Sequence, residues 1–194
     1  MEALNKRQAQ ALRTKSLIYD VAIELIEKKG YATIKIQDIC QKSNVSVGTF
    51  YHYYKSKSDI LAEFYKKADE HFLEHQQDIL KSNEVTEQIV DFFVFYAKYN
   101  ERIGIDLMKE LYNSDNKMFI QKGRHMQTIL NQLVQKGQAR NLIVSTYSSE
   151  EITTQIFVFI RGQVYDWCLN DGSYDLEIAI EKSIRLILSI YLKK

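Results

Sequence analysis

The sequence predicts an all-α protein. Apolar residues recur at spacings of three and four along nearly every long segment, which is the pattern that gives a helix one buried face. The 194 residues include no proline, and the only β-like run is Asn-Leu-Ile-Val at 141–144, which is too short to build a sheet. We therefore expect an N-terminal three-helix domain with a helix-turn-helix at residues 1–56, followed by a larger helical domain at 57–194.

The first two helices of the N-terminal domain are set by apolar stripes. One stripe consists of Leu17, Ile18, Val21, Ala22, Leu25 and Ile26. Gly30 closes this first helix. In the second, shorter helix, Ile36, Ile39 and Cys40 share one face. These two helices are expected to pack against each other through their apolar faces.

A tight turn and a third helix follow. Asn44 tolerates the left-handed backbone that a tight turn needs, and Ser46 is a good N-cap for the next helix. Phe50 and Tyr54 lie on one face of that helix and should point inward. The outer face and its flanks carry Val47, Gly48, Thr49, Tyr51, His52 and Tyr53. A short, nearly neutral face with a glycine suits close approach to the DNA major groove, with Lys55 and Lys57 placed for phosphates.

The charge is divided unevenly along the chain. Residues 1–67 hold 12 Lys/Arg against seven Asp/Glu, whereas the remainder holds 14 against 18, so the overall charge is only +1. The N-terminal third is therefore the part expected to face an anion. Lys6, Arg7, Arg13 and Lys15 could form a mobile arm or a helix start near phosphates, or simply a solvated N-terminus.

These residues resemble the DNA-binding domain of TetR-like transcriptional regulators. The resemblance covers about residues 14–65 and rests on Asp38-Ile39-Cys40, Asn44-Val45-Ser46, the run 48–54 (Gly-Thr-Phe-Tyr-His-Tyr-Tyr) and Lys57. The chain departs from the family pattern at Lys35, Cys40 and Asn44. Because Lys35 replaces the usual Ser/Thr cap, the start of the second helix is open, with Thr33 as the nearest substitute cap.

The resemblance implies a dimeric, ligand-responsive DNA-binding regulator, a repressor by family habit, whose palindromic operator is double-stranded DNA. The predicted DNA-binding residues are Lys35, Ser46, Val47, Gly48, Thr49, Tyr51, His52, Tyr53, Lys55 and Lys57. Thr49, Tyr51, Ser46 and Lys57 are expected to fix position on phosphates. Val47, Gly48, His52 and Tyr53 are expected to face or flank the bases.

The second domain reads as further helices. They are expected at 57–80, 85–99, 102–113, 117–136, 148–169 and 174–192. Ser148 and Glu151 form a Ser-x-x-Glu capping box at the start of the fifth of these. The Asn-Asp-Gly run at 170–172 should end it.

The last two helices carry the stripes expected to form the homodimer. The candidate interface residues are Ile156, Phe159, Ile160, Gln163, Val164, Ile180, Ile184, Ile187, Leu188 and Tyr191. Pairing this helix hairpin with its copy would give a four-helix interface with a two-fold axis, an arrangement that the resemblance also implies. The alternative is that both stripes are buried within one subunit.

The density of aromatic residues at 90–99 favours a pocket for a small, largely hydrophobic effector. Five aromatic residues in ten positions are too many for one inward stripe, so some should face a second surface. The candidate effector-binding residues are Phe92, Phe93, Tyr96, Tyr112, His125, Arg161, Tyr165 and Trp167. The alternative is that these rings form ordinary core.

Two other classes of function stay open. His71-Phe72-Leu73-Glu74-His75 fits the H-x-x-E-H pattern of some zinc peptidases, which would require a third ligand, or it binds a metal incidentally. A helical protein-interaction module without DNA binding is the second rival. With no Ser-His-Asp arrangement, P-loop or dinucleotide fingerprint, we expect no enzyme activity, no cofactor and no functional metal.

We also expect a cytoplasmic location and no membrane partner. The N-terminus lacks an apolar signal core, and the chain has no uncharged apolar run of 18 residues. The two cysteines, Cys40 and Cys168, lie far apart in the sequence and are expected to be small buried hydrophobic residues.

Overall fold

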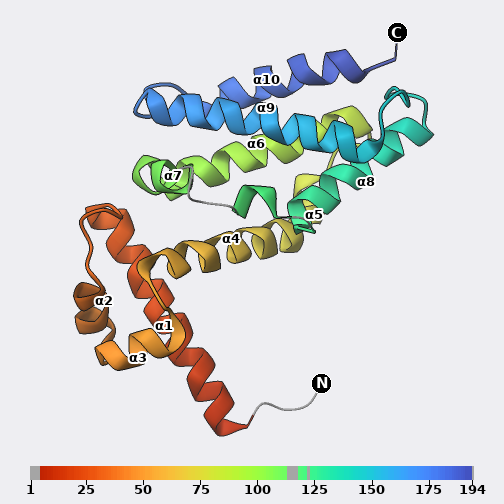
Figure 1. The fold of residues 1–194 in the computed structure, drawn as a ribbon. Coiled ribbons are helices and arrows are strands. Elements are labelled where there is room, and N and C mark those ends of the chain that lie inside the picture. Colours follow the sequence, from red (N-terminus) through yellow and green to blue (C-terminus); the bar gives the residue numbers. More distant parts are fainter. Residues whose placement is uncertain (1–4, 113–117, 122, 194) are drawn as a thin grey trace. The chain divides into compact units, whose positions relative to one another are not determined.

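The structure is a computed structural model that describes residues 5–112, 118–121 and 123–193. Within these ranges the chain forms α-helices joined by turns, together with one short 3-10 helix (Figure 1). Among the described residues, the only β pairing is an isolated bridge between Ile143 and Leu192. The all-α prediction is confirmed, and the β-like run at 141–144 builds no sheet.

The chain divides into two compact units, Met1–Lys66 and Lys67–Lys194. The first contains α1 (Lys6–Lys29), α2 (Ile36–Ser43), α3 (Val47–Tyr53) and the beginning of α4 (Lys57–Glu74). The division falls inside α4, later than the boundary predicted at 56/57. Ile60 and Phe64, on the first turns of α4, are buried in this unit, and Lys15 pairs with Glu63 at 2.7 Å.

Helix α1 starts earlier than its apolar stripe. The Asn5 side chain accepts a hydrogen bond from the N–H of Gln8, and the Gln8 side chain accepts one from the N–H of Asn5, so the two form a capping box. The basic residues at 6–15 are therefore helical, which selects the helix start over the mobile arm. Gly30, with φ +77°, ends α1 as expected.

The start of α2 is settled by an acidic residue. The Lys35 backbone N–H donates to the Asp38 carboxylate at 2.8 Å, and α2 begins at Ile36. Thr33, the predicted substitute, is not the N-cap. Because Asp38 lies in the first turn, its charge also complements the positive end of the helix dipole.

The second unit contains the end of α4, the short α5 (Gln76–Ile79), α6 (Val85–Ile103), α7 (Ile105–Leu111) and the 3-10 helix η1 (Met118–Ile120). It continues with α8 (His125–Ala139), α9 (Ser149–Leu169) and α10 (Leu176–Tyr191). Helices α9 and α10 lie side by side; α10 also packs on α6, and α8 packs on both α6 and α9 (Figure 1).

Two predicted helix boundaries were wrong. The single helix expected at 57–80 is interrupted at His75, and the helix expected at 117–136 starts only at His125. Gly123 has φ +79°, a conformation that ends any helix approaching from the N-terminal side. Residues 113 and 117, where two predicted helices were to end and begin, lie outside the described residues.

The α9–α10 hairpin follows its local signals. Ser148 and Glu151 form the predicted capping box at the start of α9. Asp171 (φ +53°) and Gly172 (φ +69°) make the predicted turn after Leu169, and Asp175 caps α10. None of the helices in the described part of the chain combines the length and apolar character needed to cross a lipid bilayer.

Candidate DNA-binding surface and effector domain

The turn between α2 and α3 is built by two residues with strong local preferences. Asn44 has φ +54° and ψ +42°, the left-handed conformation that asparagine tolerates. The Ser46 side chain accepts a hydrogen bond from the N–H of Thr49 at 3.0 Å and so caps α3. Both predictions for this turn are confirmed. A defined turn fixes the direction in which α3 leaves α2.

The inner face of α3 holds it against the rest of the unit. Phe50 is fully buried and Tyr54 is 2% exposed, as predicted. The Tyr54 hydroxyl donates to the backbone carbonyl of Lys15 on α1 at 3.4 Å. Burial raises the pKa of Tyr54, so this hydroxyl stays protonated and remains a donor.

The outer face of α3 is open to solvent even though it carries large side chains. Val47 is 42% exposed and Tyr51 is 51% exposed, and His52 is exposed beside the half-buried Tyr53. Thr49 is half-buried, and its hydroxyl lies 2.8 Å from that of Ser46. The Tyr51 ring packs edge-on against Phe50, with centroids 5.7 Å apart, but large parts of Val47 and Tyr51 stay open to solvent, so this face is available to a partner.

Gly48 lies in the middle of this outer face. A Cβ at Gly48 would meet only the Ser46 Oγ, at 3.7 Å, which is ordinary van der Waals contact. Its backbone is helical, without the positive φ that would demand glycine. The packing within the unit therefore gives no reason for a glycine here. Close approach of an external molecule does give one.

The predicted lysines differ in their surroundings. Lys35 and Lys55 are exposed at the ends of the helix-turn-helix. The Lys57 ammonium instead donates to the carbonyls of Tyr31 at 2.6 Å and Ile34 at 3.1 Å, and lies 4.1 Å from the centre of the Tyr31 ring. Lys57 thus ties the start of α4 to the α1–α2 connection, a role that sequence spacing could not reveal. One of its three N–H groups remains for another acceptor.

The predicted effector residues fall into two groups in the second unit. Phe92 and Phe93 are fully buried and Tyr96 is 6% exposed, and the Tyr96 hydroxyl lies 3.0 Å from that of Tyr112. Arg161 joins this group because its guanidinium donates to the carbonyls of Phe119 at 2.8 Å and Phe157 at 3.0 Å. The Phe119 ring lies 4.6 Å from that of Tyr112 at a tilt of 51°, and Phe157 packs edge-on against both Phe92 and Phe93.

The other three predicted effector residues lie apart from this cluster. His125 is exposed at the start of α8, and Tyr165 is 47% exposed on α9. The Trp167 indole N–H donates to the carbonyl of Tyr174 at 2.9 Å, which stabilises the α9–α10 turn. Which of the eight bind an effector stays a prediction.

Sequence reasoning missed a largely buried ion pair in the same unit. The Arg124 guanidinium donates to the Asp69 carboxylate at 2.8 and 3.2 Å, and each side chain is 12% exposed. Both Arg124 and Arg161 act electrostatically on the Tyr96 hydroxyl, lowering a pKa that burial raises. Arg124 and Asp69 are 55 positions apart in the sequence, so no local signal could pair them.

The predicted dimer stripe is divided between the interior and the surface. The residues of this stripe buried within the subunit are Ile156, Ile160, Val164, Ile180, Ile184 and Leu188. Phe159 is 40% exposed, and Gln163, Ile187 and Tyr191 are half-buried. The large apolar residues exposed on the hairpin share only Phe159 with this stripe. We name them the hairpin face: Val158, Phe159, Tyr165, Leu169, Ile178, Leu186 and Ile190.

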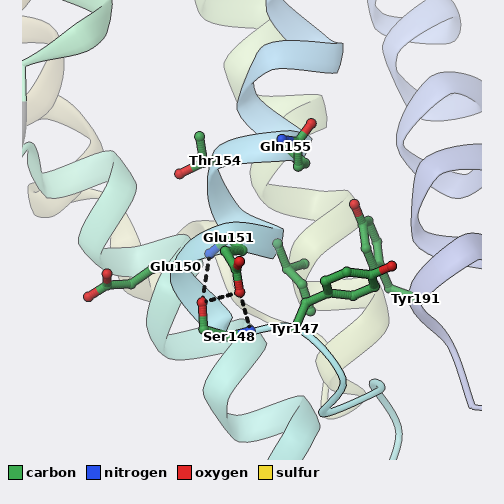
Figure 2. Close-up of a pocket in the computed structure, with 8 residues that line it drawn as sticks. Tyr147, Ser148, Glu150, Glu151, Thr154, Gln155 and Tyr191 are labelled. Atoms are coloured by element: carbon green, nitrogen blue, oxygen red, sulfur yellow. Dashed lines mark hydrogen bonds between the residues drawn. The ribbon is translucent and has the colours of Figure 1, made fainter.

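An open groove of about 570 Å³ lies where α9 begins and α10 ends (Figure 2). Tyr147 and Tyr191 form its aromatic wall, with their rings 6.2 Å apart at 89°. The Glu151 carboxylate accepts hydrogen bonds from the Ser148 hydroxyl and N–H, which lowers the pKa of Glu151 (Figure 2). The Glu151 carboxylate is thus already engaged in capping α9. None of the predicted effector residues lines this groove.

A helix-turn-helix with an open outer face, followed by a helical domain, defines the class as a DNA-binding transcriptional regulator. Residues 18–64 match the sequence model of the tetR family of bacterial regulatory proteins. This match confirms the resemblance of the helix-turn-helix to that of TetR-like regulators.

Comparison with known proteins extends this likeness along the chain. The fatty acid metabolism regulator protein of Bacillus subtilis (strain 168) is 26% identical over 182 residues, covering 88% of this chain and 91% of that protein. The structure of the transcriptional regulator FadR from Bacillus subtilis in complex with stearoyl-CoA is similar with a TM-score of 0.72 and 26% identity, covering 90% of this chain and 97% of that one.

A third comparison concerns the fold alone. The TetR-family repressor FadR of Thermus thermophilus, in complex with lauroyl-CoA, has a TM-score of 0.74 at 20% identity, covering 93% of this chain and 96% of that one. The two-domain helical architecture therefore extends over almost the whole length of both chains.

Proposed function

We propose that this protein is a homodimeric transcriptional repressor that binds a palindromic operator and is released from it by an acyl-chain effector. The observation that carries the proposal is the outer face of α3, where Val47, Gly48 and Tyr51 are exposed and where packing within the unit gives no reason for a glycine at position 48. The match of residues 18–64 to the tetR family supports it.

On the DNA, we assign the outer face of α3 to the bases and its surroundings to the phosphates. Val47, Gly48 and His52 would face the major groove, with Tyr53 at the flank. The proposed phosphate contacts are Lys35, Ser46, Thr49, Tyr51, Lys55 and the remaining N–H of Lys57. Because Ser46 and Thr49 are hydrogen-bonded to each other, they would present their hydroxyls to a phosphate as a fixed pair.

The homodimer would form through the hairpin face rather than through the buried parts of the predicted stripe. Exposed Val158, Phe159, Leu186 and Ile190 supply apolar area on neighbouring helices. Gly162 is exposed between them on α9, and a Cβ there would meet nothing within 4 Å, so two copies of the helix could approach closely. A two-fold axis through this face would set two α3 helices about one DNA turn, roughly 34 Å, apart.

The effector is proposed to be a long-chain acyl thioester. The relative that is 26% identical over most of its length is a fatty acid metabolism regulator, and the similar FadR structure from the same species holds stearoyl-CoA. The second unit offers aromatic rings suited to an acyl chain, and the positive charge of Arg161 near the Tyr96 hydroxyl would favour an anionic end. The effector would lower DNA affinity by binding better to the form that does not fit the operator.

Salt dependence tests the DNA-binding part of this proposal directly. Affinity for duplex fragments from the source genome is measured by fluorescence anisotropy at increasing salt concentrations. If lysines neutralise phosphates, the logarithm of the affinity falls linearly with the logarithm of the salt concentration, by about 0.9 per neutralised phosphate. A weak affinity that does not change with salt would favour the rival function, a helical protein-interaction module.

A further inference from the structure

The last turn of α4 brings two imidazoles and a carboxylate together on one side of the helix. His71, Glu74 and His75 are spaced at i, i+3 and i+4, and one ligand atom from each lies within 4.8 Å of the others. The cluster lies in the second unit, and the proposed repressor mechanism does not use it.

Both imidazoles are held in place by their surroundings. The His71 ring is stacked on Phe95, with centroids 5.5 Å apart, and lies 5.4 Å from the ring of Tyr99 on α6. The His75 Nδ1 lies 2.9 Å from the backbone carbonyl of His71. The rings of His71 and His75 are 4.1 Å apart. The two rings thus already lie close together before any ligand arrives, which lowers the entropic cost of binding.

The hydrogen bond of His75 also decides which nitrogen is free. A carbonyl can only accept, so Nδ1 carries a proton, and in the neutral imidazole Nε2 then carries the lone pair. A ring N–H donated to a backbone carbonyl, with the other nitrogen left for a metal, is the usual arrangement of a ligating histidine. His75 therefore has the tautomer that a metal ion requires.

From this arrangement we propose that His71, Glu74 and His75 bind a transition-metal dication, with Zn²⁺ as the reference ion. Imidazole nitrogens favour Zn²⁺, Ni²⁺ and Cu²⁺ over Mg²⁺ and Ca²⁺, which prefer oxygen ligands. Ligand atoms about 2.1 Å from a tetrahedral Zn²⁺ lie roughly 3.4 Å apart, so the side chains need to close by about 1 Å or a little more.

The rest of the coordination and charge can be met at this site. Glu74 is exposed, so its carboxylate is free to rotate toward the ion, and solvent water would fill the fourth position. The positive charge of Arg102 acts on the His71 imidazole, and the negative charge of the Glu74 carboxylate opposes this effect. A bound metal ion would cross-link the side chains at the end of α4, next to the start of α5.

Direct titration of the full-length, tag-free protein with ZnCl₂ tests the site, using isothermal titration calorimetry at constant pH. The chain has four histidines, so the two outside the cluster provide matched controls. We expect one Zn²⁺ per chain in the wild type and in both His52→Ala and His125→Ala. Affinity should fall by at least about tenfold in His75→Ala, and by a smaller factor in Glu74→Gln, with excess Mg²⁺ unable to compete.

Glu74→Gln removes only an exposed charge, so it keeps the test valid even if a histidine variant unfolds. The proposal is overturned if the wild type binds Zn²⁺ no more tightly than His75→Ala and Glu74→Gln, or if a control histidine proves to be the ligand. Because the titration uses the protein alone, its outcome is independent of DNA binding and of the acyl effector.

Discussion

Gly48 is the residue whose identity the rest of its unit least explains. It lies near the start of α3, it has a helical backbone, and a side chain there would meet only Ser46. Alanine in its place should raise the stability of the unit by about 0.5 kcal/mol, because alanine loses less backbone entropy in a helix than glycine does. A methyl group on the outer face of α3 should nevertheless weaken operator binding by tenfold or more, about 1.4 kcal/mol.

Thermal unfolding and DNA titration of Gly48→Ala measure the two effects separately. The combination of a more stable protein and weaker DNA binding is specific to a surface that approaches DNA closely. If Gly48→Ala binds the operator as tightly as the wild type, then the backbone at α3 does not approach the bases and the assignment is wrong.

Lys55 and Lys57 form a matched pair that separates charge from structure. Lys57→Ala removes an ammonium that satisfies two carbonyls, so it should cost roughly 1–2 kcal/mol of unfolding free energy and also weaken binding to every DNA sequence. Lys55→Ala should leave stability within about 0.5 kcal/mol and lower the salt slope by about one.

Urea denaturation and salt-dependent DNA binding of the two variants give the answer. Equal stability of Lys55→Ala and Lys57→Ala would show that the hydrogen bonds of Lys57 do not matter to the fold. In that case Lys57 would be a phosphate contact alone, as the sequence analysis expected.

At the scale of single residues, sequence reasoning worked where the deciding interaction is local. Asn44, Ser46 and the inward side chains of Phe50 and Tyr54 all follow from preferences that act within a few residues. The direction of the Lys57 side chain depends on carbonyls more than 20 positions earlier in the chain, so spacing could not predict it.

Among the elements, the α9–α10 hairpin carries the proposed dimer through its exposed side chains. Leu186 is 62% exposed on α10, so replacing it with glutamate should leave the folded chain intact. A charge at this position in a dimer interface would be desolvated without a partner, and dimerisation should weaken by about 2 kcal/mol or more.

Sedimentation equilibrium of Leu186→Glu against the wild type measures this effect. Leu12→Glu is the matched control, because Leu12 is a 54% exposed leucine on α1 and the same substitution there should leave the dimer unchanged. If the Leu186→Glu protein sediments as the wild type does, the dimer interface does not include this position of α10.

Helix starts and ends were most clearly predictable where a capping residue or a glycine marked them. Ser148, Gly30 and the turn at 170–172 gave correct boundaries for their helices. The interruption at His75 has neither glycine nor proline to mark it, and the effect of Gly123 was outweighed by the apolar periodicity around it. The choice between the buried stripe and the exposed hairpin face could not be made from periodicity, because both faces of α9 carry apolar residues.

For the whole molecule, the proposed mechanism requires that effector binding and operator binding oppose each other through the protein. Stearoyl-CoA should lower the affinity for the operator by at least about fivefold, within the range of ordinary allosteric coupling. By reciprocity, saturating operator should lower the affinity for stearoyl-CoA by the same factor. Free coenzyme A, which lacks the acyl chain, is the matched control and should have little effect.

Anisotropy titrations with stearoyl-CoA, a short-chain acyl-CoA and coenzyme A measure this coupling. A response of equal size to all three would place recognition on the coenzyme A moiety rather than on the acyl chain. If none of the three changes the affinity, the proposal of an acyl effector is wrong, whereas the proposal of DNA binding still stands.

The overall architecture and the helix-turn-helix could be predicted from the sequence because periodicity, capping and a specific motif act along the chain. The contacts that organise the second unit could not. Arg124 with Asp69, and Arg161 with the Phe119 carbonyl, join residues more than 40 positions apart. The effector class rests on relatives rather than on residues, since buried aromatic rings look alike in a pocket and in a core.

The most direct test of the central claim is capture of genomic DNA fragments by the purified protein at low salt, followed by sequencing, with Tyr51→Ala as the comparison. Tyr51 is exposed on the outer face of α3 and contributes little to the core, so the variant should stay folded. We expect the wild type to enrich fragments sharing a palindrome with half-sites about 10 base pairs apart, centre to centre, and Tyr51→Ala to lose most of this enrichment. Capture of no common motif, or equal enrichment by the folded Tyr51→Ala protein, would contradict it.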